Sequence, residues 1–272
     1  MPKMTITSAT IAIDCPRHRP CIEMSYIDAG AGEALVLIHG LGGSAASWEP
    51  QIEAFSSGYR VIAPDLRGHG SSGHRAGEAV SIRAFADDLA ALLRGLKVEQ
   101  AHVCGNSMGG MIALELWVRR PFLLKSLVLA DTAAFFPPPL ILDDFLRLFD
   151  RMDMKAWAEF MAPRLLGPGA PASLQEEVME TMAATPRAVY RRALAATFSA
   201  DYRWMLPLVE FPSLILVGEE DQATPVGYAR FLEHHIRDSL LRVVPAAAHL
   251  PQRENPGEFN RHLRAHLERL GG

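Results

Sequence analysis

The sequence predicts an α/β domain built on a mostly parallel sheet, with helices on both of its faces and a helical segment inserted near the middle of the chain. Three observations lead to this prediction. Short apolar runs alternate with longer segments of helical periodicity, and the later runs are apolar almost throughout. Residues 141–205 then show helical periodicity without a convincing strand, and the alternation resumes after them.

The strands are expected where the apolar runs are short and the helices where apolar residues recur every three to four positions. We expect a β-ribbon over residues 5–13, then strands over 23–28, 35–39, 60–63, 101–104, 126–130, 212–217 and 240–244. Helices are expected over 82–96, 108–120 and 256–270. The last of them carries Phe259, Leu263, Leu267 and Leu270 along one apolar face.

The inserted segment divides the chain into two parts. Residues 1–134 and 206–272 would form the sheet domain, and residues 135–205 would form a helical cap. The run Phe135-Phe-Pro-Pro-Pro139 breaks regular structure at the start of this insertion. Because the insertion directly follows a strand near the predicted nucleophile, we expect it to cover a pocket as a lid.

Composition is typical of an ordinary globular protein. The chain has 272 residues, with 27 basic and 31 acidic ones spread along it, and its net charge is -4. No basic run predicts nucleic-acid binding, and no apolar run is long enough to span a membrane. The N-terminus lacks the pattern of a secretory signal, so we expect a cytoplasmic protein, monomeric or homodimeric, whose cysteines (Cys15, Cys21 and Cys104) are reduced.

Gly105-Asn-Ser107-Met-Gly109 matches the pattern G-x-S-x-G between an expected strand and an expected helix. A sharp turn there would lift Ser107 clear of the sheet, and larger residues at the two glycine positions would collide with neighbouring backbone. Ser107 is therefore the predicted nucleophile. A plain helix cap at this serine is the alternative that the context disfavours.

An attacked carbonyl needs backbone donors for its developing negative charge. The amide of Met108, directly after the nucleophile, is one predicted donor. The glycine-rich loop over residues 39–43 supplies the other, and Leu41 is its best candidate. Gly40 in this loop is expected to lie against the substrate.

A carboxylate is expected after the nucleophile in the chain, at the end of a strand. Asp221 follows the strand that ends near residue 217, and it is favoured over its neighbours Glu219 and Glu220. Asp131 also ends a strand, but we favour a helix cap or a supporting role for it. Asp65 precedes the nucleophile and so violates the expected order.

The base is expected on the loop after the last strand, where His249 is the one histidine of ten that fits. His39 and His69 are expected to form local hydrogen bonds, and His102 to be packed within its strand. For His262 and His266, one helical turn apart among arginines, we expect a solvated helix face. No Cys/His/carboxylate group has zinc spacing, so neither a metal nor a cofactor is predicted.

Together these motifs resemble the α/β-hydrolase superfamily over nearly the whole chain. The resemblance rests on residues 39–40, 65–70 and 105–110, on Asp221 with Pro225, and on His249 with residues 254–256. It implies the α/β-hydrolase fold, a triad of Ser107, Asp221 and His249, and a cap over the pocket. A serine at residue 107 disfavours the dehalogenase and epoxide-hydrolase branches, which carry aspartate there. The sequence is most similar to bacterial 3-oxoadipate enol-lactonase-type and carboxylesterase-type members.

The expected activity is hydrolysis of an ester or lactone of a small organic substrate through an acyl-enzyme. Hydrolysis of a carbon–carbon bond in a vinylogous diketone, as in meta-cleavage hydrolases, is the first alternative, and a ligand receptor without catalysis is the second. Aromatic residues are expected to line the pocket, namely Trp48, Phe135, Trp157 and Trp204. Arginines of the cap are candidates for binding a substrate carboxylate, namely Arg147, Arg151, Arg164, Arg191, Arg192 and Arg203.

Overall fold

The computed structural model describes residues 7–15, 19–75, 77–136 and 140–270. Eight strands form one sheet in the order β1-β2-β4-β3-β5-β6-β7-β8. Strands β1 and β2 pair antiparallel, as do β2 and β4, and all other neighbours are parallel. The predicted mostly parallel sheet is confirmed. The strands are β1 (Thr7–Cys15), β2 (Arg19–Ala29), β3 (Glu33–Ile38), β4 (Tyr59–Pro64), β5 (Ala101–Asn106), β6 (Leu124–Ala130), β7 (Ser213–Gly218) and β8 (Ser239–Val244).

Helices cover both faces of this sheet, and each face has its own apolar core. One face packs against α2 (Ile82–Gly95), α3 (Met108–Arg119) and α8 (Val226–His235). The other packs against α1 (Glu49–Phe55) and α10 (Pro256–Leu270), through Phe55, Phe259 and Leu263 among others. Strands β5 and β7 are buried along their whole length, which explains their continuous apolar sequences.

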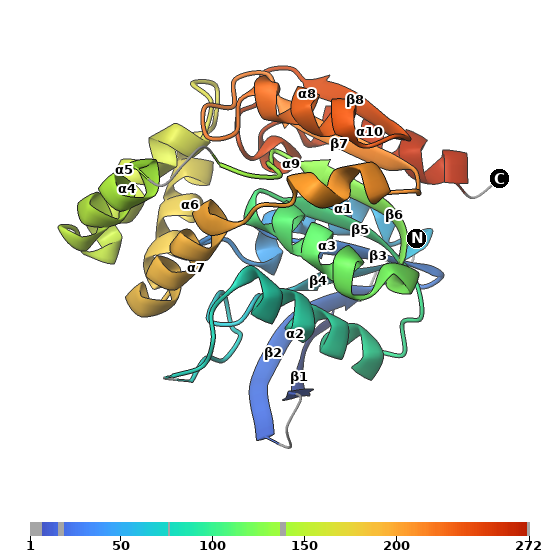
Figure 1. The fold of residues 1–272 in the computed structure, drawn as a ribbon, viewed down its shortest axis with the longest axis horizontal. Coiled ribbons are helices and arrows are strands. Elements are labelled where there is room, and N and C mark those ends of the chain that lie inside the picture. The colour runs from blue at the N-terminus through green and yellow to red at the C-terminus, as the bar shows by residue number, and fades with distance from the viewer. Residues whose placement is uncertain (1–6, 16–18, 76, 137–139, 271–272) are drawn as a thin grey trace.

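In the described part of the chain, four α-helices lie between β6 and β7, where the cap was expected. They are α4 (Leu140–Asp150), α5 (Met154–Leu165), α6 (Ala172–Ala184) and α7 (Arg187–Ser199). Figure 1 shows them gathered beyond one end of the sheet. They have an apolar core of their own, centred on Phe149, Trp157 and Tyr190.

The ends of the insertion meet at its base. Phe135 and Asp201 form an isolated antiparallel bridge, and the amide of Tyr202 donates to the carbonyl oxygen of Ala134 at 2.7 Å. A short 3-10 helix, Arg203–Leu208, then leads back to the sheet. The chain therefore leaves and re-enters the sheet domain at nearly one point.

One expectation about the last helix is wrong. His262 and His266 are not solvated, because the side of α10 that carries them is turned inward and leaves them 8% and 3% exposed. His262 lies 3.1 Å from Glu258, whereas neither ring nitrogen of His266 has a hydrogen-bond partner among the described residues. His102 is packed as expected, 2.8 Å from Ser126 Oγ.

Two further features concern membrane-spanning helices and cysteine thiols. Within the described ranges, none of the helices is both long and apolar enough to cross a membrane. Cys104 is a free, buried thiol. The side chains of Cys15 and Cys21 lie outside the described part of the chain.

Candidate active site

Ser107 stands on a sharp turn between β5 and α3. Its backbone has φ 55° and ψ -122°, a strained conformation for a residue other than glycine. The amide of Ser107 donates to the carbonyl oxygen of Ala130 at 2.9 Å, and the hydroxyl of Thr132 donates to the carbonyl oxygen of Ser107 at 2.6 Å. These contacts with the end of β6 hold the turn in place.

The two glycines of the motif are required by close backbone contacts. A Cβ atom on Gly105 would lie 2.2 Å from the carbonyl oxygen of Gly109. A Cβ atom on Gly109 would lie 2.3 Å from the carbonyl oxygen of Ile38. Both distances are far below any allowed contact, so the sequence pattern follows from the tight packing of α3 against β3 and β5.

Ser107, His249 and Asp221 form one hydrogen-bonded chain. His249 Nε2 lies 2.9 Å from Ser107 Oγ, and His249 Nδ1 lies 2.9 Å from Asp221 Oδ2. His249 is 4% exposed and Asp221 5%. Glu219 and Glu220, the competing acids, are exposed. The residues predicted as nucleophile, base and acid thus meet, although Ser107 precedes Asp221 and His249 by more than a hundred positions in the chain.

Asp221 is held as an anion. It accepts hydrogen bonds from the amides of Ala223 and Thr224, at 2.8 and 3.1 Å, and from Thr224 Oγ1 at 2.7 Å. Burial raises the pKa of Asp221, but the charge and hydrogen bond of His249 and the bonds from Thr224 outweigh it and hold the pKa below the ordinary value. The carboxylate can therefore fix the ring of His249 and stabilise its protonated form.

The loop that carries His249 is tied to three parts of the molecule. Asn106 Nδ2 donates to the carbonyl oxygen of His249 at 3.0 Å. The amide of His249 donates to the carbonyl oxygen of Leu165, at the end of α5, also at 3.0 Å. Glu254 accepts from the amides of Gly167, Ala248 and Leu250 at 2.7, 3.0 and 3.1 Å. Sequence reasoning gave no structural role to Asn106, Thr224 or Glu254, because their partners are distant in the chain or provided by loop backbone.

The glycine-rich loop is oriented by His39. Because the amide of Leu66 donates to His39 Nε2 at 3.0 Å, the ring proton sits on Nδ1, which donates to the carbonyl oxygen of Gly40 at 2.7 Å. In a trans peptide the C=O and N–H bonds point in opposite directions. The bond from His39 therefore fixes the direction of the Leu41 amide as well. Neither the Leu41 amide nor the Met108 amide donates to an acceptor among the described residues, so both can bind an oxyanion.

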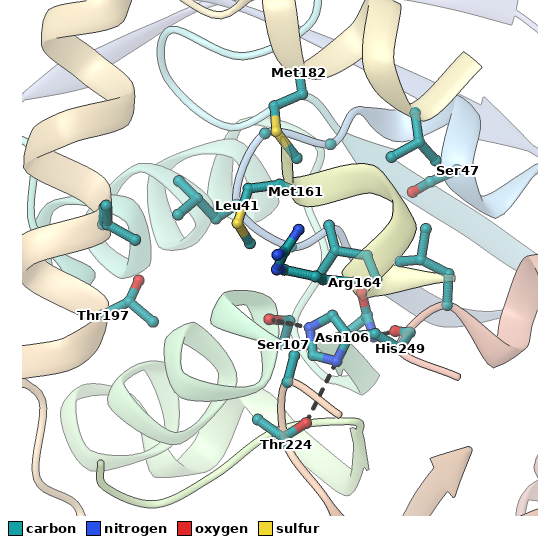
Figure 2. A pocket seen from close by; sticks show the side chains of 18 of the residues that line it. Leu41, Ser47, Asn106, Ser107, Met161, Arg164, Met182, Thr197, Thr224 and His249 are labelled. Atoms are coloured by element: carbon teal, nitrogen blue, oxygen red, sulfur yellow. Dashed lines mark hydrogen bonds between the residues drawn. The ribbon is translucent and has the colours of Figure 1, made fainter. Parts of the chain in front are cut away.

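Ser107 and His249 open into a cavity of about 580 Å³ between the loops at the edge of the sheet and the helices α4 to α7. Figure 2 shows Leu41, Met161 and Met182 along its upper side, with Ser107, His249 and Thr224 below them. The lining is mostly apolar, and the predicted Gly40 and Leu41 belong to it. Its apolar side chains from the cap include Phe145, Met161, Val178, Met182, Leu194 and Phe198.

The aromatic residues predicted for this pocket do not line it. Trp48 is fully buried beneath the sheet and packs on Phe259, with ring centres 6.0 Å apart. Trp157 is fully buried in the cap's own core, and Trp204 is 63% exposed. Phe135 packs on Phe231 outside the cavity, and its neighbour Phe136 lines the cavity instead. The aromatic side chains that do line the cavity, Phe136, Phe145 and Phe198 among them, are not those predicted from the sequence.

Arg164 is the one predicted cap arginine that lines the cavity. Its Nη1 donates to the carbonyl oxygen of Phe160 at 2.5 Å, and its guanidinium lies over the Phe160 ring. Figure 2 shows it projecting into the space above Ser107 and His249. Glu177 also lines the cavity, but Arg253 pairs with it at 2.5 and 2.8 Å. Arg164 therefore supplies a positive charge that no acidic side chain among the described residues neutralises.

Comparison with known proteins identifies the family. A profile of the alpha/beta hydrolase family matches residues 35–262. The chain belongs to this family. A 3-oxoadipate enol-lactonase of Acinetobacter baylyi is 30% identical over 254 residues, which cover 92% of this chain and 94% of the enol-lactonase.

Solved structures agree with that assignment. An esterase of Thermogutta terrifontis, with malate bound, has a TM-score of 0.89 and 28% identity, and the match covers 97% of this chain and 99% of the esterase. The enol-lactonase of Burkholderia xenovorans has a TM-score of 0.87 and 25% identity, with 96% and 100% covered. The predictions of the α/β-hydrolase fold and of a hydrolase are confirmed.

Proposed function

We propose that this alpha/beta hydrolase cleaves a carboxylic ester or lactone of a small organic acid through a covalent acyl-enzyme on Ser107. The observation that carries the proposal is the hydrogen-bonded chain from Ser107 through His249 to Asp221, with Ser107 and His249 lining a mostly apolar cavity. The names of the relatives, esterase and enol-lactonase, agree with this reaction class.

The geometry suggests each step. His249 Nε2 takes the proton of Ser107 Oγ as this oxygen attacks the carbonyl carbon, and Asp221 stabilises the resulting imidazolium. The amides of Leu41 and Met108 bind the oxyanion. His249 then gives its proton to the leaving alcohol oxygen. A water molecule, deprotonated by His249, attacks the acyl-enzyme and releases the acid.

A panel of substrates tests the proposal. We expect turnover of p-nitrophenyl butyrate and of a simple enol-lactone, and no more than trace cleavage of a vinylogous 1,5-diketone. Preferred cleavage of the diketone would reassign the protein to carbon–carbon bond hydrolysis. Absence of turnover of every substrate by a folded protein would leave a ligand receptor.

Arg164 favours a substrate that carries a carboxylate away from the bond that is cleaved. A guanidinium can bind a carboxylate through two parallel hydrogen bonds, and this exposed one lines the cavity with no acidic partner among the described residues. The name of the Acinetobacter relative, 3-oxoadipate enol-lactonase, refers to a substrate of this kind.

Replacing Arg164 with glutamine is therefore expected to lower kcat/KM for monomethyl adipate by about 10-fold or more, while kcat/KM for neutral methyl hexanoate changes by less than about threefold. Titration of released acid at constant pH measures both. Arg151→Gln, an exposed cap arginine outside the cavity, is the matched control and should change neither. An equal loss for the two esters in Arg164→Gln would show that this residue does not select for charge.

A further inference from the structure

A second carboxyl group lies beside Asp221 and has no part in the proposed reaction. Asp131 follows β6, and Asp221 follows the neighbouring strand β7, so both lie at the same edge of the sheet. Each offers an oxygen, and His249 a ring nitrogen, such that the three atoms lie within 4.8 Å of one another. Since both His249 nitrogens are engaged, by Ser107 and by Asp221, the group has no imidazole nitrogen left for a metal ion.

The hydrogen bonds of the two carboxyl groups differ. Asp221 accepts from four donors, namely two amides, a hydroxyl and the His249 ring. Asp131 Oδ1 accepts from the amide of Gly218 at 2.7 Å. Asp131 Oδ2 is buried, and within the described ranges no donor reaches it. This oxygen is therefore the one place in the pair where a proton can sit without displacing an existing donor.

When two carboxylates lie this close and are both nearly excluded from water, the charge of one strongly disfavours ionisation of the other. Asp131 is 1% exposed. Burial, followed by the charge of Asp221, raises the pKa of Asp131 well above its ordinary value. The other titratable groups near Asp131 do not reverse this rise in its pKa. Glu254 is acidic as well, and the cationic form of His249 is paired with Asp221.

We propose that Asp131 is a neutral carboxylic acid whose Oδ2–H donates to Asp221, and that it thereby acts as a positioning residue for the acid of the proposed triad. Its other oxygen holds Gly218, the residue from which the loop carrying Asp221 departs. Gly218 also packs tightly on the His249 loop, since a Cβ on it would lie 2.0 Å from the carbonyl oxygen of Ala248. The positioning role rests on the proposed function, whereas the protonation state does not.

Asparagine is the matched replacement, because its amide nitrogen can donate to Asp221 while its oxygen accepts from Gly218. It also tolerates the positive φ of 43° at this position. We expect Asp131→Asn to keep kcat/KM within about threefold of the wild-type value. In the pH profile of kcat/KM, the midpoint of the acidic limb should stay within about 0.3 pH units of the wild-type midpoint. Asp131→Ala lacks both the donor to Asp221 and the acceptor for Gly218, so its kcat/KM should fall by about 10-fold or more. The midpoint of the acidic limb should move upward, because Asp221 loses a donor and attracts the proton of His249 more strongly. An ionised Asp131 would instead make Asp131→Asn lower the midpoint by about one unit or more.

Infrared spectroscopy tests the proton without relying on activity. We expect the folded wild-type protein at pH 7 to show a carboxylic-acid C=O band, shifted in D₂O, that disappears in Asp131→Asn. Glu254 and the other acids are common to both proteins and cancel in the difference spectrum. Identical spectra in this region, or a lost carboxylate band in its place, would overturn the proposal. Failure of ester turnover would refute the proposed function while leaving this result intact.

Discussion

Replacing Ser107 with alanine is expected to lower kcat for ester hydrolysis by about 10⁵- to 10⁶-fold, because it removes the oxygen that is proposed to form the acyl-enzyme. The hydrogen bond between Ser107 Oγ and His249 Nε2 at 2.9 Å is the basis for this expectation. The fold should persist, since the strained backbone of Ser107 is held by hydrogen bonds of its main chain, to Ala130 and from Thr132, which alanine keeps. Hydrolysis of p-nitrophenyl butyrate measures the loss, and circular dichroism checks the fold.

Two further variants test the role of Asp221 and provide a control for the loss of activity in Ser107→Ala. Asp221→Asn should lower kcat by about 10⁴-fold, because the amide cannot stabilise the His249 imidazolium as a carboxylate does. Ser199→Ala, at an exposed serine that ends α7, is the control and should retain full activity. A Ser107→Ala enzyme with a tenth of the wild-type rate would mean that catalysis proceeds without this nucleophile.

Acid is expected to unfold the protein, because buried histidines must take up protons that the folded state resists. Burial lowers the pKa of His39 to about 4 and that of His69 to about 3. Burial, followed by the charges of Arg269 and His102, lowers the pKa of His266 to about 4. The unfolded chain binds these protons near pH 6.5, so stability is complete above that pH and is lost as the pH falls toward 4.

The size of this effect follows from the depressed pKa values. A shift of two units or more corresponds to roughly 3 kcal/mol for each histidine, and the sum is comparable to the whole stability of a typical domain. Urea unfolding at pH 7.5, 6, 5 and 4.5 measures it. We expect the free energy of unfolding to fall steeply between pH 6 and pH 4.5.

A variant of His266 tests whether protonation of buried histidines causes the loss of stability in acid. Neither ring nitrogen of His266 has a hydrogen-bond partner among the described residues, so its replacement breaks no hydrogen bond of the ring. His266→Leu should stabilise the protein by about 1 kcal/mol at pH 7.5 and by clearly more at pH 5, because the replacement removes one buried group that must be protonated. The exposed His234, changed to glutamine, is the control and should leave the pH dependence unaltered. A constant effect of His266→Leu at all pH values would contradict the assigned pKa.

The features predicted correctly from sequence are those that depend on local chemistry. Parallel strands buried on both faces require continuous apolar runs, as in β5 and β7. The turn at Ser107 requires glycines at residues 105 and 109, where a Cβ would strike backbone. Such requirements are visible in the chain itself.

The features that sequence reasoning missed depend on which side of an element faces the cavity. Phe135 and Phe136 are adjacent, yet only the second lines the cavity. Trp157 fills the core among the cap helices, which no periodicity of α5 alone could reveal. Likewise, the position of Asp131 beside Asp221 follows from the adjacency of β6 and β7 in the sheet, although their ends are separated by the whole cap in the chain.

The central claim is that Ser107 forms a covalent acyl intermediate with the help of His249. It is tested most directly by treating the protein with a fluorophosphonate and locating the adduct by mass spectrometry of the digested chain. We expect one adduct per chain, on the peptide that contains Ser107, and a strongly reduced labelling rate in His249→Ala. An enzyme that turns over esters while Ser107 stays unmodified, or that carries its adduct on another residue, would contradict the account.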